Sequence, residues 1–110
     1  MDTGEVQVML RKSLDILQNV RKRPEMYFSP ITPMNVENWL YGLRVGLGIA
    51  GVQWSVEALK SACSQRGIEF TASTNLIDEL AKQGKSSEDI AMVLVEIAED
   101  MWRRILTGLA

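Results

Sequence analysis

The densest group of reactive side chains in the sequence is a run of three cations, Arg21, Lys22 and Arg23, with Tyr27 four residues after the run. Guanidinium and ammonium groups bind phosphates and carboxylates, and a tyrosine beside them adds a hydrogen-bonding group. Three cations at a helix C-terminus also complement the helix dipole without any ligand. The sequence therefore leaves two interpretations of this basic corner, residues 21–27: an anion-binding surface and a helix end.

Acidic side chains gather later in the chain. Residues 69–100 contain eight acids and two lysines, whereas residues 11–23 contain five cations and one acid. Such runs are typically solvated helix faces, and the alternative is docking to a basic partner or to a second copy of the chain. The candidate docking residues in the acidic half are Glu88, Asp89 and Glu96.

The sequence lacks the residues on which much recognisable enzyme chemistry depends. It has no histidine and a single cysteine, Cys63. This excludes histidine general bases, Ser-His and Cys-His pairs, and zinc sites that contain histidine. Paired carboxylates remain, such as Glu99-Asp100, but neighbours on a helix point about 100° apart, and we expect these two to be surface acids. We therefore predict a non-enzymatic protein without a metal or a cofactor.

The overall charge argues against nucleic acid as the main partner. Dedicated nucleic-acid binders are usually basic, whereas this chain has a net charge of −2 and an isoelectric point near 5.1. The start of the sequence lacks the basic and then apolar pattern of a secretory signal. The most apolar window, residues 39–54, is interrupted by Arg44 and is shorter than the roughly 18 to 20 residues that span a bilayer. We therefore expect a cytoplasmic protein without a membrane segment, in which Cys63 is reduced and buried.

Hydrophobic periodicity predicts the elements that must position these groups. Apolar residues recur at three- and four-residue steps in successive segments, which is typical of amphipathic helices. We therefore predict a mainly α protein, a single domain over residues 1–110 built as a bundle of about five helices, with the broadly apolar last helix at its centre. The predicted helices span residues 5–23, 33–50, 56 to the stop at 67, 75–83 and 87–107. Their expected N-caps include Thr32, Ser55, Thr74 and Ser86.

Two short segments lie between the predicted helices. Residues 26–28 are aromatic, follow Pro24 and are expected to be extended, and residues 68–70 alternate between apolar and polar side chains. These segments can pair as a small two-stranded β ribbon, which would be added to the bundle.

Two glycines, Gly42 and Gly46, lie inside the second predicted helix. Each costs about 1 kcal/mol of helix propensity relative to alanine, so we expect a compensating contact. Close approach of another helix backbone is the preferred explanation. A break in the helix near residues 46–48 is the alternative.

The segment Val20–Phe28, VRKRPEMYF, resembles the opening of the ATPase domain of the gyrase and topoisomerase IV B subunits, with the pattern V-R-K-R-P-G-M-Y-I-G. Glu25 and Ser29 replace both glycines of that pattern. The family's glutamate and asparagine on the next helix correspond to Glu37 and Tyr41, so the catalytic pair is absent, and so is the D-x-G-x-G motif that contacts adenine. The resemblance implies a shared helix-to-extended corner and not ATP hydrolysis.

The same R-K-R-P-x-M-Y corner is similar to one at the start of small bacterial proteins of unknown function, some of which resemble immunity proteins of toxin systems. We therefore expect a cytoplasmic interaction protein of unknown process, for which the immunity type is one option, and whose partner is another protein or a second copy of the chain. The alternative function is a phosphate-ligand or nucleic-acid accessory module that uses Arg21, Lys22 and Arg23.

Overall fold

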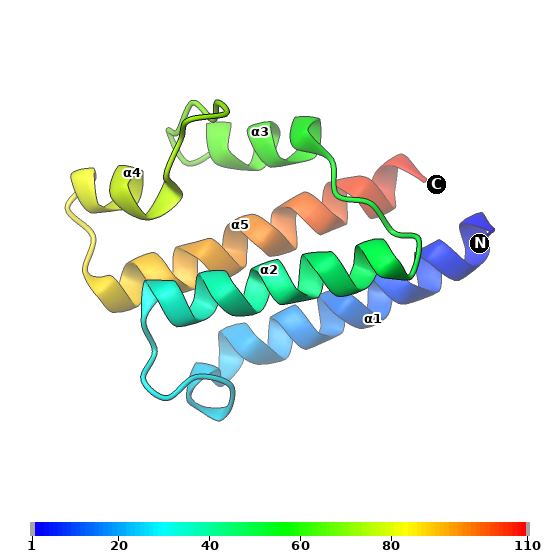
Figure 1. Ribbon diagram of the computed structural model, residues 1–110, viewed down its shortest axis with the longest axis horizontal. Coiled ribbons are helices and arrows are strands. Elements are labelled where there is room, and N and C mark those ends of the chain that lie inside the picture. The colour runs from blue at the N-terminus through cyan, green and yellow to red at the C-terminus, as the bar shows by residue number, and fades with distance from the viewer. Residues whose placement is uncertain (1, 110) are drawn as a thin grey trace.

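Helix α5 organises the fold, because it contacts every other α-helix of the molecule within the described residues. The computed structural model describes residues 2–109. In Figure 1, the long helices α1, α2 and α5 lie side by side, and the short helices α3 and α4 follow the other side of α5. The mainly α bundle of five helices is thereby confirmed, with α5 at its centre. The helices are α1 Thr3–Lys22, α2 Pro33–Ile49, α3 Val56–Ser64, α4 Leu76–Lys82 and α5 Ser87–Gly108.

Helices α1 and α5 run antiparallel, so the two ends of the chain meet at one end of the bundle (Figure 1). The Gln7 side-chain amide donates a hydrogen bond of 3.3 Å to the carbonyl of Leu109. Leu10 and Leu17 of α1 are fully buried in the same core as Trp102 of α5, which is 2 % exposed. Burial of large apolar side chains from both helices stabilises this pairing.

Side-chain caps begin the helices largely where the sequence predicts. The side chains of three expected caps each accept the backbone N–H three residues further on, and these are Thr32, Ser55 and Ser86. Helix α4 differs, because its N-cap is Asn75 and not Thr74. The Thr74 hydroxyl instead accepts a hydrogen bond from the backbone N–H of Thr71, which folds the preceding loop back on itself.

The predicted β ribbon is wrong. After α1 ends at Lys22, the chain makes a 3-10 turn, η1 (Pro24–Met26), and no strand occurs within residues 2–109. The Pro24 carbonyl accepts hydrogen bonds from the backbone N–H groups of Tyr27 and Phe28, at 3.0 and 2.9 Å. These local bonds use the groups that a second strand would need, and the Phe28 ring packs edge-on against Trp39 of α2.

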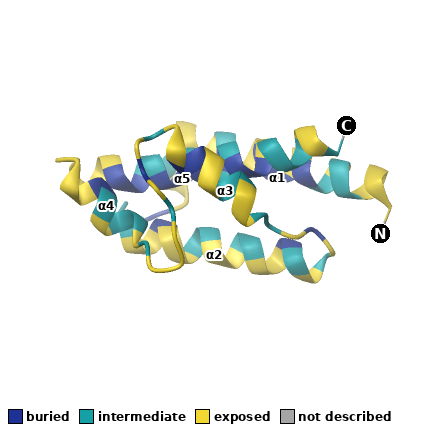
Figure 2. Cartoon of the chain, turned by 90° about the horizontal axis from the view of Figure 1, so that it is seen from above, coloured by how far each residue is buried: buried dark blue, intermediate teal, exposed yellow. Residues whose placement is uncertain are grey.

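The expectation about Gly42 and Gly46 is also wrong, in both of its forms. A Cβ atom added at either position meets nothing within 4 Å, so no helix backbone lies close to them. Helix α2 continues without a break to Ile49. Both glycines are exposed. Figure 2 shows α2 as mostly exposed and half-buried residues, in contrast to the buried residues along α5.

Candidate functional site

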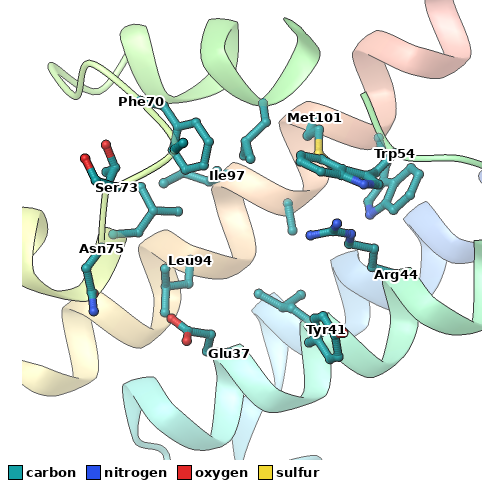
Figure 3. A pocket seen from close by; sticks show the side chains of 17 residues that line it. Glu37, Tyr41, Arg44, Trp54, Phe70, Ser73, Asn75, Leu94, Ile97 and Met101 are labelled. Atoms are coloured by element: carbon teal, nitrogen blue, oxygen red, sulfur yellow. The ribbon is translucent and has the colours of Figure 1, made fainter. Parts of the chain in front are cut away.

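A groove of about 540 Å³ opens between α2 and α3, with α5 as its floor (Figure 3). Its volume is in the range of small-molecule sites, which are mostly apolar with a few polar groups that orient the ligand. The floor is apolar and is formed by Leu94, Ile97 and Met101 of α5. Leu59 of α3 and Phe70 of the following loop supply the opposite wall.

Arg44 is the cation of the groove. It extends from α2, and its guanidinium carbon lies 3.7 Å above the centre of the Trp54 ring. Trp54 is in the loop between α2 and α3. The same carbon lies 5.9 Å from the centre of the Tyr41 ring. Guanidinium groups are attracted electrostatically to the faces of aromatic rings. Stacking on Trp54 therefore holds Arg44 at the groove.

The guanidinium of Arg44 has no ion-pair partner among residues 2–109, and no hydrogen bond from it is formed within that range. An arginine carries five N–H donors in one plane. Stacking on a ring occupies a face of this plane and leaves the edge, where the hydrogens point, open. Arg44 is thus oriented by Trp54, and its donors are free to bind an anion.

Glu37 lies on the same wall of the groove, seven residues before Arg44. Seven residues of α-helix correspond to about two turns and roughly 10 Å along the axis. The remaining polar groups of the groove come from the loop before α4 and include Ser73 and Asn75 (Figure 3). The groove therefore has a cationic and an anionic position on one wall, with apolar surface between them.

A cluster of paired charges lies on another side of α5 than the groove. Its central residues are Glu99 and Asp100. Glu99 is buried, with its side chain 10 % exposed. It accepts hydrogen bonds from Arg103 of α5 at 3.0 Å and from Arg21 of α1 at 3.4 Å. The expectation that this residue is a surface acid is wrong, because it is buried and its carboxylate is bound by Arg21 and Arg103.

Asp100 makes the equivalent connection to α3. It accepts hydrogen bonds from Arg104 at 2.8 Å and from Arg66 at 3.0 Å, and Arg66 also donates to the Ala62 carbonyl at the end of α3. Partial burial of the Asp100 carboxyl acts to raise its pKa, but the hydrogen bonds and charges of Arg104 and Arg66 outweigh burial, so the pKa is lowered from its ordinary value. This residue is a charged structural group rather than a surface acid.

The structure divides the predicted basic corner. All three cations are exposed, but Arg21 is paired with Glu99, whereas Lys22 and Arg23 form no ion pair within residues 2–109. The ring of Tyr27 lies 6.1 Å from that of Trp39, so it packs against α2. The corner therefore contributes one structural arginine and two unpaired surface cations.

The predicted acidic residues are also separated. Glu88 and Asp89 lie exposed in the first turn of α5, where carboxylates complement the helix dipole. Glu96 lies two turns further along and lines a polar hollow together with Arg21 and Arg103. Of the acidic candidates, only Glu96 is brought close to the basic corner.

The outer face of α2 is a surface that the sequence prediction missed. Four apolar side chains of this helix are exposed to solvent, from 42 % for Val45 to 85 % for Ile49. Their spacing of seven, four and four residues puts them on one side of the helix. We define the outer face of α2 by these residues, Met34, Tyr41, Val45 and Ile49.

Other reactive groups do not form a site. Cys63 is buried, and burial raises the pKa of its thiol against the opposing charge of Arg66, so its reactive thiolate is disfavoured. In the part of the chain that the structure describes, no three histidine, cysteine, aspartate or glutamate side chains gather where they could hold a metal ion. None of the helices described for residues 2–109 is long and apolar enough to cross a membrane.

Fold and surfaces together define a small helical bundle with an arginine-bearing apolar groove. No protein-family model, curated protein or solved structure matches this chain. The resemblance at Val20–Phe28 consequently remains an expectation from sequence. Function must be argued from the surfaces themselves.

Proposed function

We propose that this is a non-enzymatic interaction protein that binds a partner protein through the outer face of α2. The observation that supports the proposal is the row of exposed apolar side chains on that face, which includes Tyr41 at 62 % and Ile49 at 85 % exposure. Scattered apolar residues on a surface are ordinary, but a contiguous patch is typical of an interaction site. An amphipathic helix normally presents polar residues on the side opposite the core.

The charge distribution of α2 supports the same proposal. The helix has only two charged residues, Glu37 and Arg44. Both line the groove that runs beside α2. The centres of protein interfaces are depleted of charge and enriched in tyrosine and methionine, which the outer face supplies as Tyr41 and Met34. Gly42 lies beside them without any atom near its position, so a partner can approach the backbone there.

The basic corner lies beside α2, and in this proposal its exposed cations attract the partner toward that helix. Tyr27 contacts Trp39 of α2, and the exposed cations Lys22 and Arg23 precede it in the chain. Complementary charge at the rim of an interface guides association and orients the partner. The proposed partner is therefore a protein with an apolar patch bordered by carboxylates. The immunity type is one form of this function, and the cytoplasm remains the proposed location.

The alternative function, binding of phosphate or nucleic acid at the basic corner, is less well supported. It needs Arg21 as an anion ligand, but Arg21 is engaged by Glu99 through two contacts of 3.4 Å. Of the three cations, Lys22 and Arg23 are without a carboxylate partner within residues 2–109. This pairing favours protein interaction.

Site-specific photo-cross-linking in the cells that express the chain tests the proposal. A benzophenone amino acid is placed at Ile49 on α2, and at Ile16, an exposed apolar residue of α1, as the matched control. We expect one discrete protein adduct from position 49 that is lost when Val45→Glu is added, and no such adduct from position 16. Adducts of equal pattern from both positions, or none from position 49, would contradict the proposal.

A further inference from the structure

We infer that the groove between α2 and α3 is a binding site for a small apolar carboxylate, with Arg44 as its anchor. This inference goes beyond the proposed function, because it concerns a small ligand in the groove that adjoins the outer face of α2 and shares Tyr41 with it. The observations behind it are the open donors of Arg44, the apolar floor on α5 and the charge balance of the lining residues.

Arg44 is prepared for a planar anion. Its stacking at 3.7 Å on Trp54 fixes the plane of the guanidinium, and no carboxylate of residues 2–109 competes for its hydrogens. A guanidinium binds a carboxylate through two parallel hydrogen bonds, a geometry that a lysine cannot reproduce. Because the group is already oriented, less conformational entropy is lost on binding.

The floor of the groove selects an apolar body for this anion. Leu94, Ile97 and Met101 line it, and Phe70 faces them from the opposite wall (Figure 3). A volume of about 540 Å³ accommodates a small organic molecule. A ligand whose carboxylate meets Arg44 can bury a hydrocarbon chain or an aromatic ring along α5, which contributes roughly 25 cal/mol for each Å² removed from water.

The balance of charge favours a carboxylate over a phosphate ester. Arg44 is the cation among the residues that line the groove, and Glu37 lies two turns away on the same wall. A single negative charge is matched by Arg44, whereas a phosphate monoester carries nearly two at neutral pH and meets repulsion from Glu37. A monoanion is therefore the ligand that the groove accommodates best.

Titration with decanoate at neutral pH, below its micellar concentration, tests the inference by calorimetry and tryptophan fluorescence. We expect saturable binding at one site and a change in tryptophan emission, because Trp54 and Trp102 both line the groove. Arg44→Gln should weaken binding at least tenfold, and Arg44→Lys should recover only part of the loss. Arg11→Gln, a change at an exposed residue of α1, is the matched control and should bind as the wild type does.

Decanol and decyl phosphate serve as probes of the headgroup, and each should bind at least tenfold more weakly than decanoate. Equal affinities of Arg44→Gln and wild type would overturn the assignment of Arg44, provided that both melt at the same temperature. Tighter binding of decyl phosphate would overturn the carboxylate class, and the absence of saturable decanoate binding would overturn the site. None of these results affects cross-linking from position 49, so failure of this inference is distinguishable from failure of the proposed function.

Discussion

Helix α5 carries two regions that use arginine in opposite ways. Successive residues of a helix are about 100° apart, so Leu94, Ala98 and Met101 lie on one face and Glu96 and Arg103 on the opposite one. At the charge cluster, each arginine is matched to a carboxylate. In the groove, the arginine is supported by an aromatic ring and matched to no carboxylate within residues 2–109.

The comparison of the charge cluster with the groove distinguishes two kinds of charged side chain. Those of the cluster hold helices together, and the arginine of the groove is free to bind a ligand. Removing ions from water is costly, and a pair in the protein interior offsets this cost only when its hydrogen bonds are complete. Glu99 and Asp100 meet that condition by connecting α5 to α1 and α3. Arg44 remains partly in solvent, and its attraction to Trp54 leaves its hydrogens unused. We therefore expect the cluster to govern stability and Arg44 to govern binding.

The largest effect is expected from breaking the cluster at Asp100. Asp100→Asn leaves Arg66 and Arg104 without a charged acceptor, and these side chains are only 27 % and 34 % exposed. The change should destabilise the protein by about 1 to 3 kcal/mol. Urea unfolding with an unchanged slope measures it. A loss below about 0.5 kcal/mol would show that the cluster does not hold α3 to α5.

Acid should break the same pairs in the wild type. The pKa of Asp100 is lower in the folded protein than its ordinary value of about 4 in an unfolded chain. The stability contributed by this group is therefore complete above that value and is lost as the pH falls through the folded pKa. Urea midpoints between pH 6 and 3 should fall less steeply for Asp100→Asn than for the wild type. Parallel plots of urea midpoint against pH for the two proteins would show that Asp100 does not cause the loss of stability in acid.

A gain in stability is expected on α2, where no other helix packs against the glycines. Gly46→Ala introduces a methyl group that meets nothing within 4 Å. Because alanine is the better helix former, the free energy of unfolding should rise by about 0.5 to 1 kcal/mol. Thermal melts followed by circular dichroism measure this change. A decrease would mean that another element packs against this side of α2.

The smallest effect is expected from the unpaired cations of the basic corner. The double variant Lys22→Gln, Arg23→Gln should change the free energy of unfolding by less than about 1 kcal/mol, because both side chains are exposed and unpaired within the described chain. Its photo-adduct from position 49 should nevertheless decrease, because the cations that attract the partner are lost. A destabilisation as large as that of Asp100→Asn would place these cations among the structural pairs.

Most of the fold could be predicted from local patterns. The helices followed from apolar spacing, and Thr32, Ser55 and Ser86 cap them as expected because capping depends on a side chain and a backbone group three residues apart. The ribbon failed because residues 26–28 satisfy their hydrogen bonds within a turn at Pro24. Short aromatic segments do not distinguish a strand from such a turn.

The candidate sites depended on contacts that local patterns do not contain. Arg21 and Glu99 are 78 positions apart, and Arg66 and Asp100 are 34 apart, so their pairing follows from helix packing alone. One indication of the groove was present in the sequence. Arg44 interrupts an apolar window and has no acid three or four residues away, which is the spacing at which a helix would pair it.

The most direct test compares Arg44→Gln and Asp100→Asn side by side, each measured for its free energy of unfolding and its affinity for decanoate. Arg44→Gln should lose at least tenfold in affinity and at most about 1 kcal/mol of stability, which is the contribution of its contact with Trp54. Asp100→Asn should lose about 1 to 3 kcal/mol of stability and bind decanoate as the wild type does while it remains folded. The same loss of affinity in both variants, or a loss of stability only in Arg44→Gln, would contradict the division between structural and available arginines.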